Sequence, residues 1–288
     1  MQSDVRYPAQ AGTFYESDPE RLKQQIIGCF KHRLGPGKLP STRDQPLSKV
    51  IGIVSPHAGY MYSGPVAAHG FLKLAEDGRP KTAIILGPNH TGLGSGVSIM
   101  ADGKWYMPFG DVEIDREVAS KILENCDIID IDVTAHMYEH SIEVQIPFLQ
   151  FLYGDIKIVP ICMMLQDQAT STEVGTCIYQ AVGNRIGKDI VIIASSDFTH
   201  YEPHEIAYEK DMSAIERILQ LNIEEFFNVI RYRNISVCGP GPIGALMAIA
   251  REFNAKPRLL KWASSGDVVG YKGEVVGYAS IIFEKSTS

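Results

Sequence analysis

The 288-residue sequence has no apolar run long enough to cross a bilayer, which takes roughly 18 consecutive apolar residues. The first residues lack a basic segment followed by an apolar one, so no secretory signal is predicted. Lysine and arginine form no stripe, and the formal net charge is −7, which disfavours a nucleic-acid partner. We therefore expect a soluble, cytoplasmic protein that binds neither membranes nor nucleic acid.

Cysteine is scarce, with five widely spaced residues and no Cys-x-x-Cys pair. Such an odd, scattered set argues against both a disulfide framework and a zinc ribbon. We expect four of the five, all but Cys238, to be buried as small apolar side chains. The sequence also lacks a Walker loop and a Gly-x-Ser-x-Gly elbow, which leaves little support for an NTPase or a serine hydrolase.

Low-complexity stretches, like-charge runs and internal repeats are missing too, so nothing marks a linker between domains. With 45% hydrophobic residues, the chain can bury a large core. We expect a single α/β domain over residues 1–288.

Short runs rich in β-branched residues predict the strands. They are continuous rather than alternating, which is typical of a parallel sheet covered by helices on both faces. Segments with helical spacing lie between them, and this alternation predicts an α/β fold with a central, mostly parallel or mixed sheet flanked by helices on both faces. The strongest strands are expected at 49–55, 82–87 and 189–195, weaker ones at 157–163, 258–263 and 274–283, helices at 65–76, 116–126, 140–153, 171–187, 204–219 and 242–254, and an irregular hairpin at 105–115.

Each of the three strongest strands runs into a loop with chemically capable side chains. His57 follows the first strand, His90 the second, and Asp197 and His200 the third. Ligands of open α/β sheets bind outside the carboxyl ends of the strands, so these loops are expected to converge on one crevice. Two histidines in equivalent positions, each close behind a proline that stiffens the turn, suit metal ligation. The alternative is that each histidine caps or packs.

Cys238 is the third candidate ligand. It lies just before a predicted helix, whose positive end would lower the pKa of the thiol and favour a reactive thiolate or a metal ligand. A packed cysteine beside a Gly-Pro turn is the alternative. The Gly-x-G-x-x-Gly pattern that follows, at residues 239–244, is discounted as a dinucleotide site because its two prolines remove amide donors.

The remaining polar candidates have two interpretations each. His200 could act as a general base oriented by Asp197, although Asp197 could instead cap a helix. Glu139 and Glu143, which flank His140, could support a metal-bound imidazole, or they could be solvated acids in the first turn of a helix. Tyr60, Tyr62 and Tyr201 could wall a small-molecule pocket or pack in the core.

Together these motifs resemble the Memo family, named for mediators of cell motility, over nearly the whole chain. A prokaryotic member is called an AmmeMemoRadiSam system protein B. The motifs stand in the same order with comparable spacing: Ala-Gly-Thr-Phe-Tyr at 11–15, SPHAGYMYSG at 55–64, LGPNH at 86–90, EHSIEVQIPFL at 139–149, SSDFTHY at 195–201, and Cys238-Gly239.

The family fold is similar to that of the class III extradiol dioxygenases of the LigB type, which are non-haem iron enzymes. By this resemblance His57 and His90 are the histidine ligands, Cys238 takes the place of a glutamate ligand, and His200 is the catalytic histidine. Asp197 would line the same pocket. A thiolate makes a softer site that also suits copper or zinc, so ring cleavage does not follow.

The resemblance implies a metal-binding, oxidoreductase-like protein that uses Fe(II), with copper or zinc as alternative metals and an unknown small molecule or peptide as its partner. Two other functions stay open: a non-catalytic module that binds a peptide or an anion in the same cleft, and a zinc hydrolase. The sequence is compatible with an oligomer and does not specify its state.

Overall fold

Four parallel strands form the centre of the fold. The computed structural model, which describes residues 5–286, orders them as β2, β9, β3 and β8. All four were predicted from their apolar runs, and the structure confirms them with small changes at their ends. Their bounds are β2 Val50–Ser55, β9 Ile190–Ser195, β3 Thr82–Pro88 and β8 Lys157–Met163.

Antiparallel strands extend this parallel centre, so the sheet is mixed. On one side β12 pairs with β2, and both β11 and β10 pair with β12. On the other side β4 runs antiparallel to β8, and β7 is parallel to β4. These strands are β12 Val275–Glu284, β11 Lys256–Ser264, β10 His200–Glu202, β4 Val97–Ile99 and β7 Asp130–Ile131.

A small second sheet contains the predicted hairpin. Strands β5 (Lys104–Trp105) and β6 (Val112–Glu113) pair antiparallel, and β1 (Val5–Arg6) adds a parallel strand to β5.

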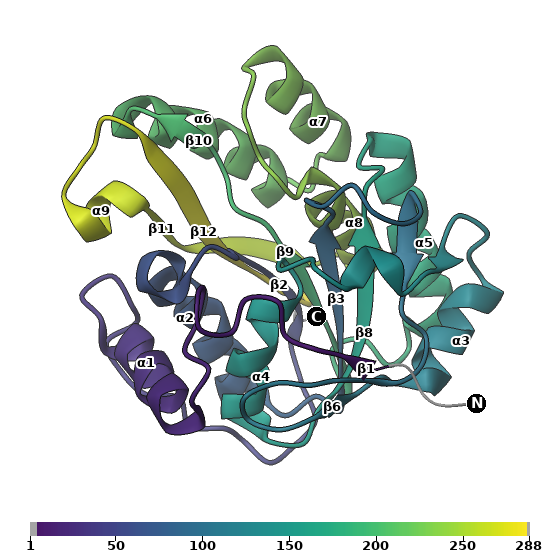
Figure 1. The fold of residues 1–288 in the computed structure, drawn as a ribbon. Helices are drawn as coiled ribbons and strands as arrows, with labels where there is room; N and C mark the ends of the chain where they lie inside the picture. Colours follow the sequence, from purple (N-terminus) through teal and green to yellow (C-terminus); the bar gives the residue numbers. More distant parts are fainter. Residues whose placement is uncertain (1–4, 287–288) are drawn as a thin grey trace.

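Helices cover both faces of the large sheet, which confirms the predicted architecture (Figure 1). One face carries α1 (Pro19–Lys31), α2 (Tyr60–Asp77) and α4 (Ile146–Tyr153). The other carries α3 (Arg116–Glu124), α5 (Gln168–Val182), α7 (Ile223–Tyr232) and α8 (Pro240–Glu252). Helix α6 (His204–Leu219) packs on β11 and β12, and the short α9 (Ser265–Val269) lies between those two strands in sequence.

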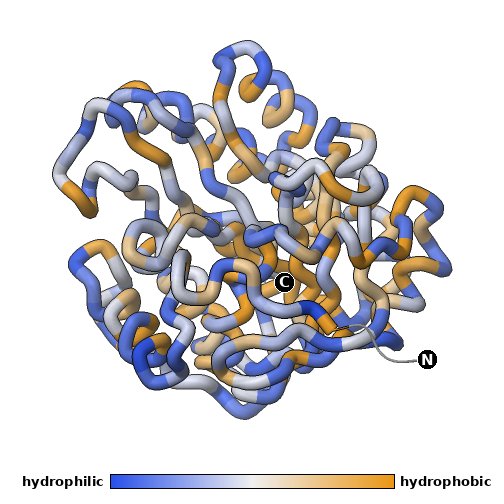
Figure 2. Tube along the Cα trace, viewed as in Figure 1, coloured by the Kyte–Doolittle hydropathy of each residue, from blue (hydrophilic) through white to orange (hydrophobic). Residues whose placement is uncertain are grey.

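The continuous apolar runs are explained by these two layers. Along β3, Ala83 and Ile85 join the core beneath α1, α2 and α4, whereas Ile84 and Leu86 join the core beneath α3, α5 and α8. Successive side chains of a strand point to opposite faces, so a strand covered on both sides must be apolar at every position. Figure 2 shows the hydrophobic colour concentrated along these central strands.

The helix predicted from His140 is wrong in its first part. Residues 139–140 are irregular, residues 141–142 form a turn, a 3-10 turn follows at Glu143–Gln145, and α4 begins only at Ile146. The cause is local, because the Glu139 carboxylate accepts the backbone N–H groups of His140 and Ser141 and so competes with helical hydrogen bonding. A second 3-10 turn lies at Thr134–His136.

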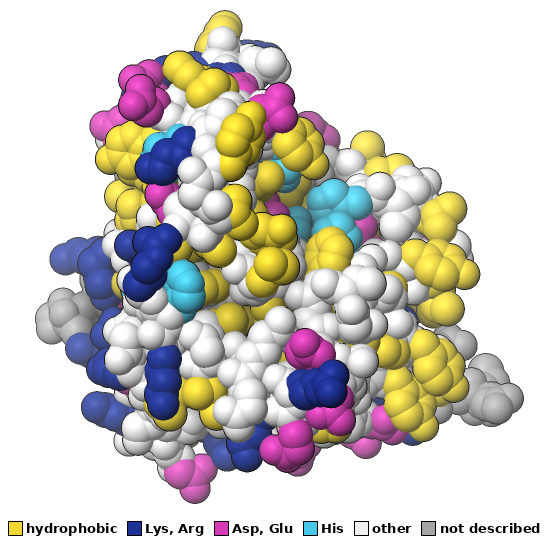
Figure 3. Space-filling model, turned by 60° about the vertical axis from the view of Figure 1, so that its left-hand side comes forward, with side chains coloured by type: hydrophobic (Ala, Val, Ile, Leu, Met, Phe, Trp, Pro, Cys, Tyr) yellow, Lys and Arg dark blue, Asp and Glu magenta, His cyan; other side chains and the backbone are white. Residues whose placement is uncertain are grey.

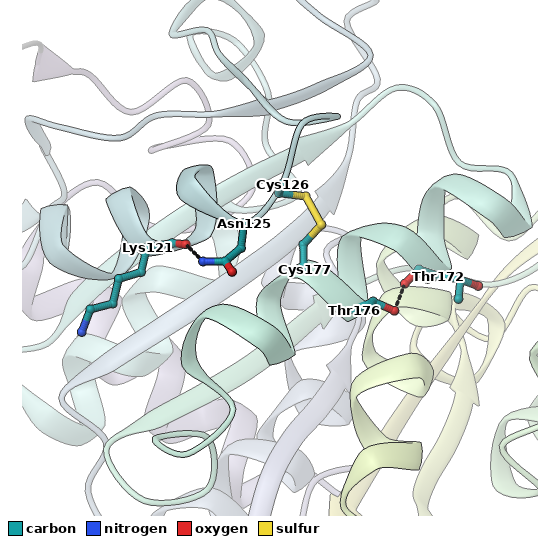
Figure 4. The surroundings of a disulfide bond; sticks show 6 residues. All are labelled: Lys121, Asn125, Cys126, Thr172, Thr176 and Cys177. Carbon is teal, nitrogen blue, oxygen red and sulfur yellow. Dashed lines mark hydrogen bonds between the residues drawn. A yellow bond between two sulfur atoms is a disulfide. The ribbon is translucent and has the colours of Figure 1, made fainter.

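Two cysteines are joined in a way that the sequence did not indicate. Cys126, just after α3, forms a disulfide with Cys177 of α5, 51 residues further along the chain (Figure 4). Both side chains are buried, as expected, and this single disulfide was not predicted by the sequence analysis, which argued against a disulfide framework. The disulfide links the end of α3 to α5 on one face of the sheet.

No helix within residues 5–286 is long and apolar enough to pass through a membrane.

Candidate metal centre

Three histidines meet at the carboxyl ends of the central strands. His57 follows β2 directly and His90 follows β3, while His140 comes from the turn before α4. One ring nitrogen from each lies within 4.8 Å of the other two, a spacing that suits ligands of one metal ion. The predicted convergence of the loops after β2 and β3 is therefore confirmed, and His140 is an addition that the sequence did not identify as a candidate ligand.

The surroundings of His57 fix its tautomer. Ser195 Oγ donates its only proton to the Ser141 carbonyl at 2.6 Å and accepts a hydrogen bond from Gln145 Nε2 at 2.8 Å. The 2.9 Å contact between His57 Nδ1 and this same hydroxyl therefore requires Nδ1 to be the donor. Nε2 of His57 therefore carries a lone pair, which is the state that a metal ligand needs.

The buried Glu139 carboxylate fixes the tautomer of the second imidazole, His90. His90 Nδ1 lies 2.9 Å from Glu139 Oε1, so Nδ1 donates and Nε2 keeps its lone pair. His140 Nδ1 lies 3.4 Å from the same oxygen. The His90 and His140 rings stack with their centroids 4.5 Å apart.

Burial favours the uncharged form of two of the three imidazoles, His57 and His140. Loss of solvent lowers the pKa of His57 well below its usual value, and the neighbouring histidines lower it further. Burial also lowers the pKa of His140 to about 4, although Glu139 opposes the shift. The cluster still reaches the surface, because the His90 side chain is 33% exposed and that of His140 20% exposed. Figure 3 shows histidine side chains together in a hollow bordered by hydrophobic ones.

Cys238 lies beside His57. Its Sγ is 3.2 Å from His57 Nε2 and accepts a hydrogen bond from the Asp197 backbone N–H at 3.1 Å. The sulfur does not belong to the 4.8 Å group of described side chains that the three histidines form. The structure thus brings Cys238 into contact with one of its two predicted partner ligands.

The thiol is not acidified in the way the sequence suggested. Burial, and then the charge of Asp197, raise the pKa of Cys238. The first turn of α8 offers the sulfur no amide, because the Gly239 N–H binds Ser196 Oγ, the Gly241 N–H binds Gln166 Oε1, and Pro240 has no N–H.

Asp197 supports the loop that carries His57. Its Oδ1 accepts the His57 backbone N–H at 2.8 Å, and no helix starts at this position, so the helix-cap interpretation is wrong. Burial raises the pKa of Asp197 to about 6, although the His57 N–H and the neighbouring histidines favour its charged form.

His200 is oriented by Ser236 rather than by Asp197. Its Nδ1 lies 2.8 Å from the Ser236 carbonyl, which can only accept, so the ring presents Nε2 as a base. Within residues 5–286 no hydrogen bond joins His200 to Asp197. His200 lies close enough for its charge to lower the pKa of His57.

The three tyrosines differ in their environments. Tyr60 is buried, and its hydroxyl donates to the Val144 carbonyl at 2.5 Å, as expected of a core residue. Tyr62 packs in a small satellite core, and Tyr201 is 74% exposed with a positive φ of 59°.

Glu139 and Glu143 are not the solvated acids of the alternative interpretation, since both are almost fully buried. Glu143 pairs with Arg6 and accepts the Tyr15 hydroxyl at 2.5 Å.

A mixed α/β sheet with a histidine cluster at the carboxyl ends of its parallel strands defines a class of protein that could bind a metal ion. The family model described as "Memo-like protein" matches residues 6–282 of this chain. The chain belongs to the Memo family.

Relatives resemble it over almost their whole length. MEMO1 family proteins of Methanopyrus kandleri and Sulfolobus acidocaldarius are each 50% identical over 282 residues, which is 97% of this chain and 99% of each relative. The crystal structure of an uncharacterized protein from Escherichia coli K12 superposes with a TM-score of 0.52 at 12% identity, covering 80% of this chain and 98% of that one. This likeness shows a shared fold.

Proposed function

We propose that this protein is a metal-dependent, oxidoreductase-like enzyme that binds one iron or copper ion. The observation that carries the proposal is the convergence of ring nitrogens from His57, His90 and His140 within 4.8 Å of one another. In His57 and His90 the lone pair is on Nε2, because Nδ1 donates a hydrogen bond. His57 Nδ1 donates to the Ser195 hydroxyl, and His90 Nδ1 donates to Glu139. An imidazole whose Nδ1 proton is held by an acceptor presents Nε2 to a metal ion without a change of tautomer.

The donor set fits a transition metal. His57 and His90 provide two nitrogens, and we propose Cys238 as the sulfur donor beside them, with His140 as a further nitrogen. Imidazoles suit iron, copper and zinc, and a thiolate adds a soft ligand that disfavours magnesium and calcium. Fe(II) is the metal we favour, in line with the family's similarity to non-haem iron dioxygenases.

Side chains near the cluster can handle protons. A bound iron or copper ion supplies one-electron redox chemistry toward a small molecule in the hollow. We propose His200 as the general acid and base, since its Nε2 is free while Ser236 holds its Nδ1. Asp197 would support the site by fixing the backbone of His57.

Metal analysis of protein purified without added metal tests the proposal. We expect about one iron or copper ion per chain, lost in His90→Ala, whose partly exposed side chain can be removed at little cost to folding. His69→Ala is the control, because His69 is half-buried and its Nε2 contacts the Leu34 carbonyl outside the cluster. Wild-type protein that binds none of iron, copper or zinc contradicts the proposal.

A second pair of variants identifies the further donors. Cys238→Ser should weaken Cu(I) binding more than Co(II) binding, because the soft ion depends most on sulfur, whereas His140→Ala should weaken Co(II) more. Equal, wild-type affinities for both ions in Cys238→Ser would remove the thiol from the proposed site.

A zinc hydrolase is the second candidate, and the three-histidine cluster is the observation that favours it. Three protein ligands with an open position are typical of catalytic zinc sites. Stoichiometric zinc in the native protein, together with hydrolytic activity and no redox activity, would support this function over the first.

A further inference from the structure

A single carboxylate contacts both of the partly exposed histidines of the cluster. Glu139 Oε1 accepts from His90 Nδ1 at 2.9 Å, and His140 Nδ1 approaches the same oxygen at 3.4 Å. Backbone N–H groups of His90, His140 and Ser141 also donate to this carboxylate, at 2.5, 2.8 and 2.8 Å. The carboxylate therefore holds both the rings and the backbone segments that carry them.

The carboxylate is itself held still and charged. Arg6 Nη2 donates to the Glu139 carbonyl at 2.7 Å, and Arg6 Nε donates to the His136 carbonyl at 3.0 Å. These two hydrogen bonds fix the backbone of the segment that carries Glu139. Its two oxygens face donors: the His90 backbone N–H contacts Oε2, whereas His90 Nδ1 and the His140 and Ser141 backbone N–H groups contact Oε1, an arrangement that suits an ionised carboxylate. An ionised carboxylate can only accept, so the proton on His90 must be on Nδ1.

We propose that Glu139 is a positioning residue that fixes the tautomer of His90 and the orientation of both His90 and His140, and thereby sets the metal affinity of the site. This inference rests on the proposed function, because it presupposes that the histidines bind a metal. Metal binding would then require Glu139 as well as the ligands. Without this carboxylate a neutral His90 could carry its proton on Nε2, and a protonated Nε2 cannot bind a metal ion. Carboxylates behind metal-bound histidines commonly act in this way.

The chain offers a matched control in Glu143. It is as buried as Glu139 and lies four residues further on, but it serves Arg6, Tyr15 and the Ala9 and Gln10 backbone N–H groups. No hydrogen bond joins Glu143 to an imidazole in residues 5–286. Glu139→Gln and Glu143→Gln therefore make the same chemical change, and only the first touches the rings.

Titration of the full-length, metal-free protein with Co(II), followed by visible absorption with a competing chelator, tests the inference. We expect Glu139→Gln to bind Co(II) roughly 10- to 100-fold more weakly than wild type, with an altered ligand-field spectrum. Glu143→Gln should lower the thermal midpoint while it keeps the wild-type affinity and spectrum. Nitrogen-15 NMR of the metal-free wild type should show the His90 proton on Nδ1.

The outcomes separate the two proposals. Wild-type protein that binds no Co(II), iron, copper or zinc overturns the proposed function. Wild-type protein that binds Co(II), together with a Glu139→Gln variant of unchanged affinity and spectrum, overturns only the role of Glu139. If Glu139→Gln does not fold, the NMR measurement decides, because a wild-type His90 that carries its proton on Nε2 contradicts the inference directly.

Discussion

The two ends of the parallel strands differ in the exposure and arrangement of their polar side chains. At their amino ends lies a groove of about 1010 Å³, lined largely by charged residues that include Lys81, Arg185 and Asp189. Many of these charges neutralise one another, as Arg185 and Asp189 do at 2.8 Å, and they stay partly solvated. At the carboxyl ends the polar groups are fewer and more deeply buried, and their lone pairs converge. The candidate metal centre is therefore marked by side chains that converge and are buried. Neither the number of charged residues nor the volume of a groove marks it.

The strongest test of this contrast is the loss of a ligand at the carboxyl end. His57→Ala should abolish metal binding, with an affinity lowered more than about 100-fold, since removing only a partner behind a ligand already costs roughly 10- to 100-fold. Circular dichroism must show that the variant folds. Arg185→Ala, at the amino end, should bind metal as wild type does. Retained binding in His57→Ala would break the comparison.

The disulfide belongs to neither end and should affect stability without affecting the site. Replacing Cys126 and Cys177 together by serine opens a loop with a sequence separation of 51 residues, and the chain-entropy model predicts a loss of about 4 kcal/mol. Urea unfolding measures this loss. Metal affinity should stay within twofold of wild type. A large drop in affinity would show that the disulfide between Cys126 and Cys177 contributes to the geometry of the histidine cluster.

Stability should depend on pH through a histidine near the carboxyl-end network. His136 is fully buried beside Trp105, and burial, followed by the charge of Arg6, lowers its pKa to about 4, although a backbone contact with Ser98 opposes the shift. The unfolded chain binds a proton near pH 6.5 and the folded one only near pH 4, so the free energy of unfolding should fall by about 3 kcal/mol as pH drops through this window.

Urea unfolding between pH 7 and 4 measures this slope. His136→Phe, which keeps an aromatic ring beside Trp105, should reduce the slope and leave the part that comes from His57 and His140, whose pKa values burial also lowers. A slope that stays the same in the variant would assign the pH dependence to other groups.

The smallest effect is expected at the amino end. Arg185→Ala removes a partly exposed ion pair with Asp189, which should cost about 1 kcal/mol or less. Chemical denaturation in low and high salt would check it. A cost of several kcal/mol would mean that the charges of this groove are coupled far more strongly than their exposure suggests.

The strands and the loops after them were predictable because their signals are local. Apolar runs at β2, β3 and β9 reflect burial on both faces, and His57 and His90 stand next to those runs in sequence. His140 was not identified as a candidate ligand, because it reaches the cluster from the turn before α4, 50 residues after His90. The only signal in the sequence was a third histidine beside an acid, and nothing local brings it to the sheet edge.

Other misses have similar causes. Helix α1 was overlooked although Asp18 caps it and Pro19 begins it, which is a recognised start signal. The disulfide could not be predicted, since no spacing rule relates a cysteine just after α3 to one in α5, 51 residues further along the chain. The direction of the Cys238 pKa shift was wrong because helix position was weighed without burial, and burial decides the sign.

Arg6 binds two backbone carbonyl groups that lie 130 and 133 residues further along the chain. During synthesis the ribosome therefore releases Arg6 long before the carbonyl groups that it binds, and these hydrogen bonds can form only after the turn has emerged. Shortening the chain past its sixth residue, a common step when expression vectors are trimmed, would remove a buried guanidinium from beneath that turn. Such trimming should yield protein that keeps its main sheet but assembles the cluster poorly.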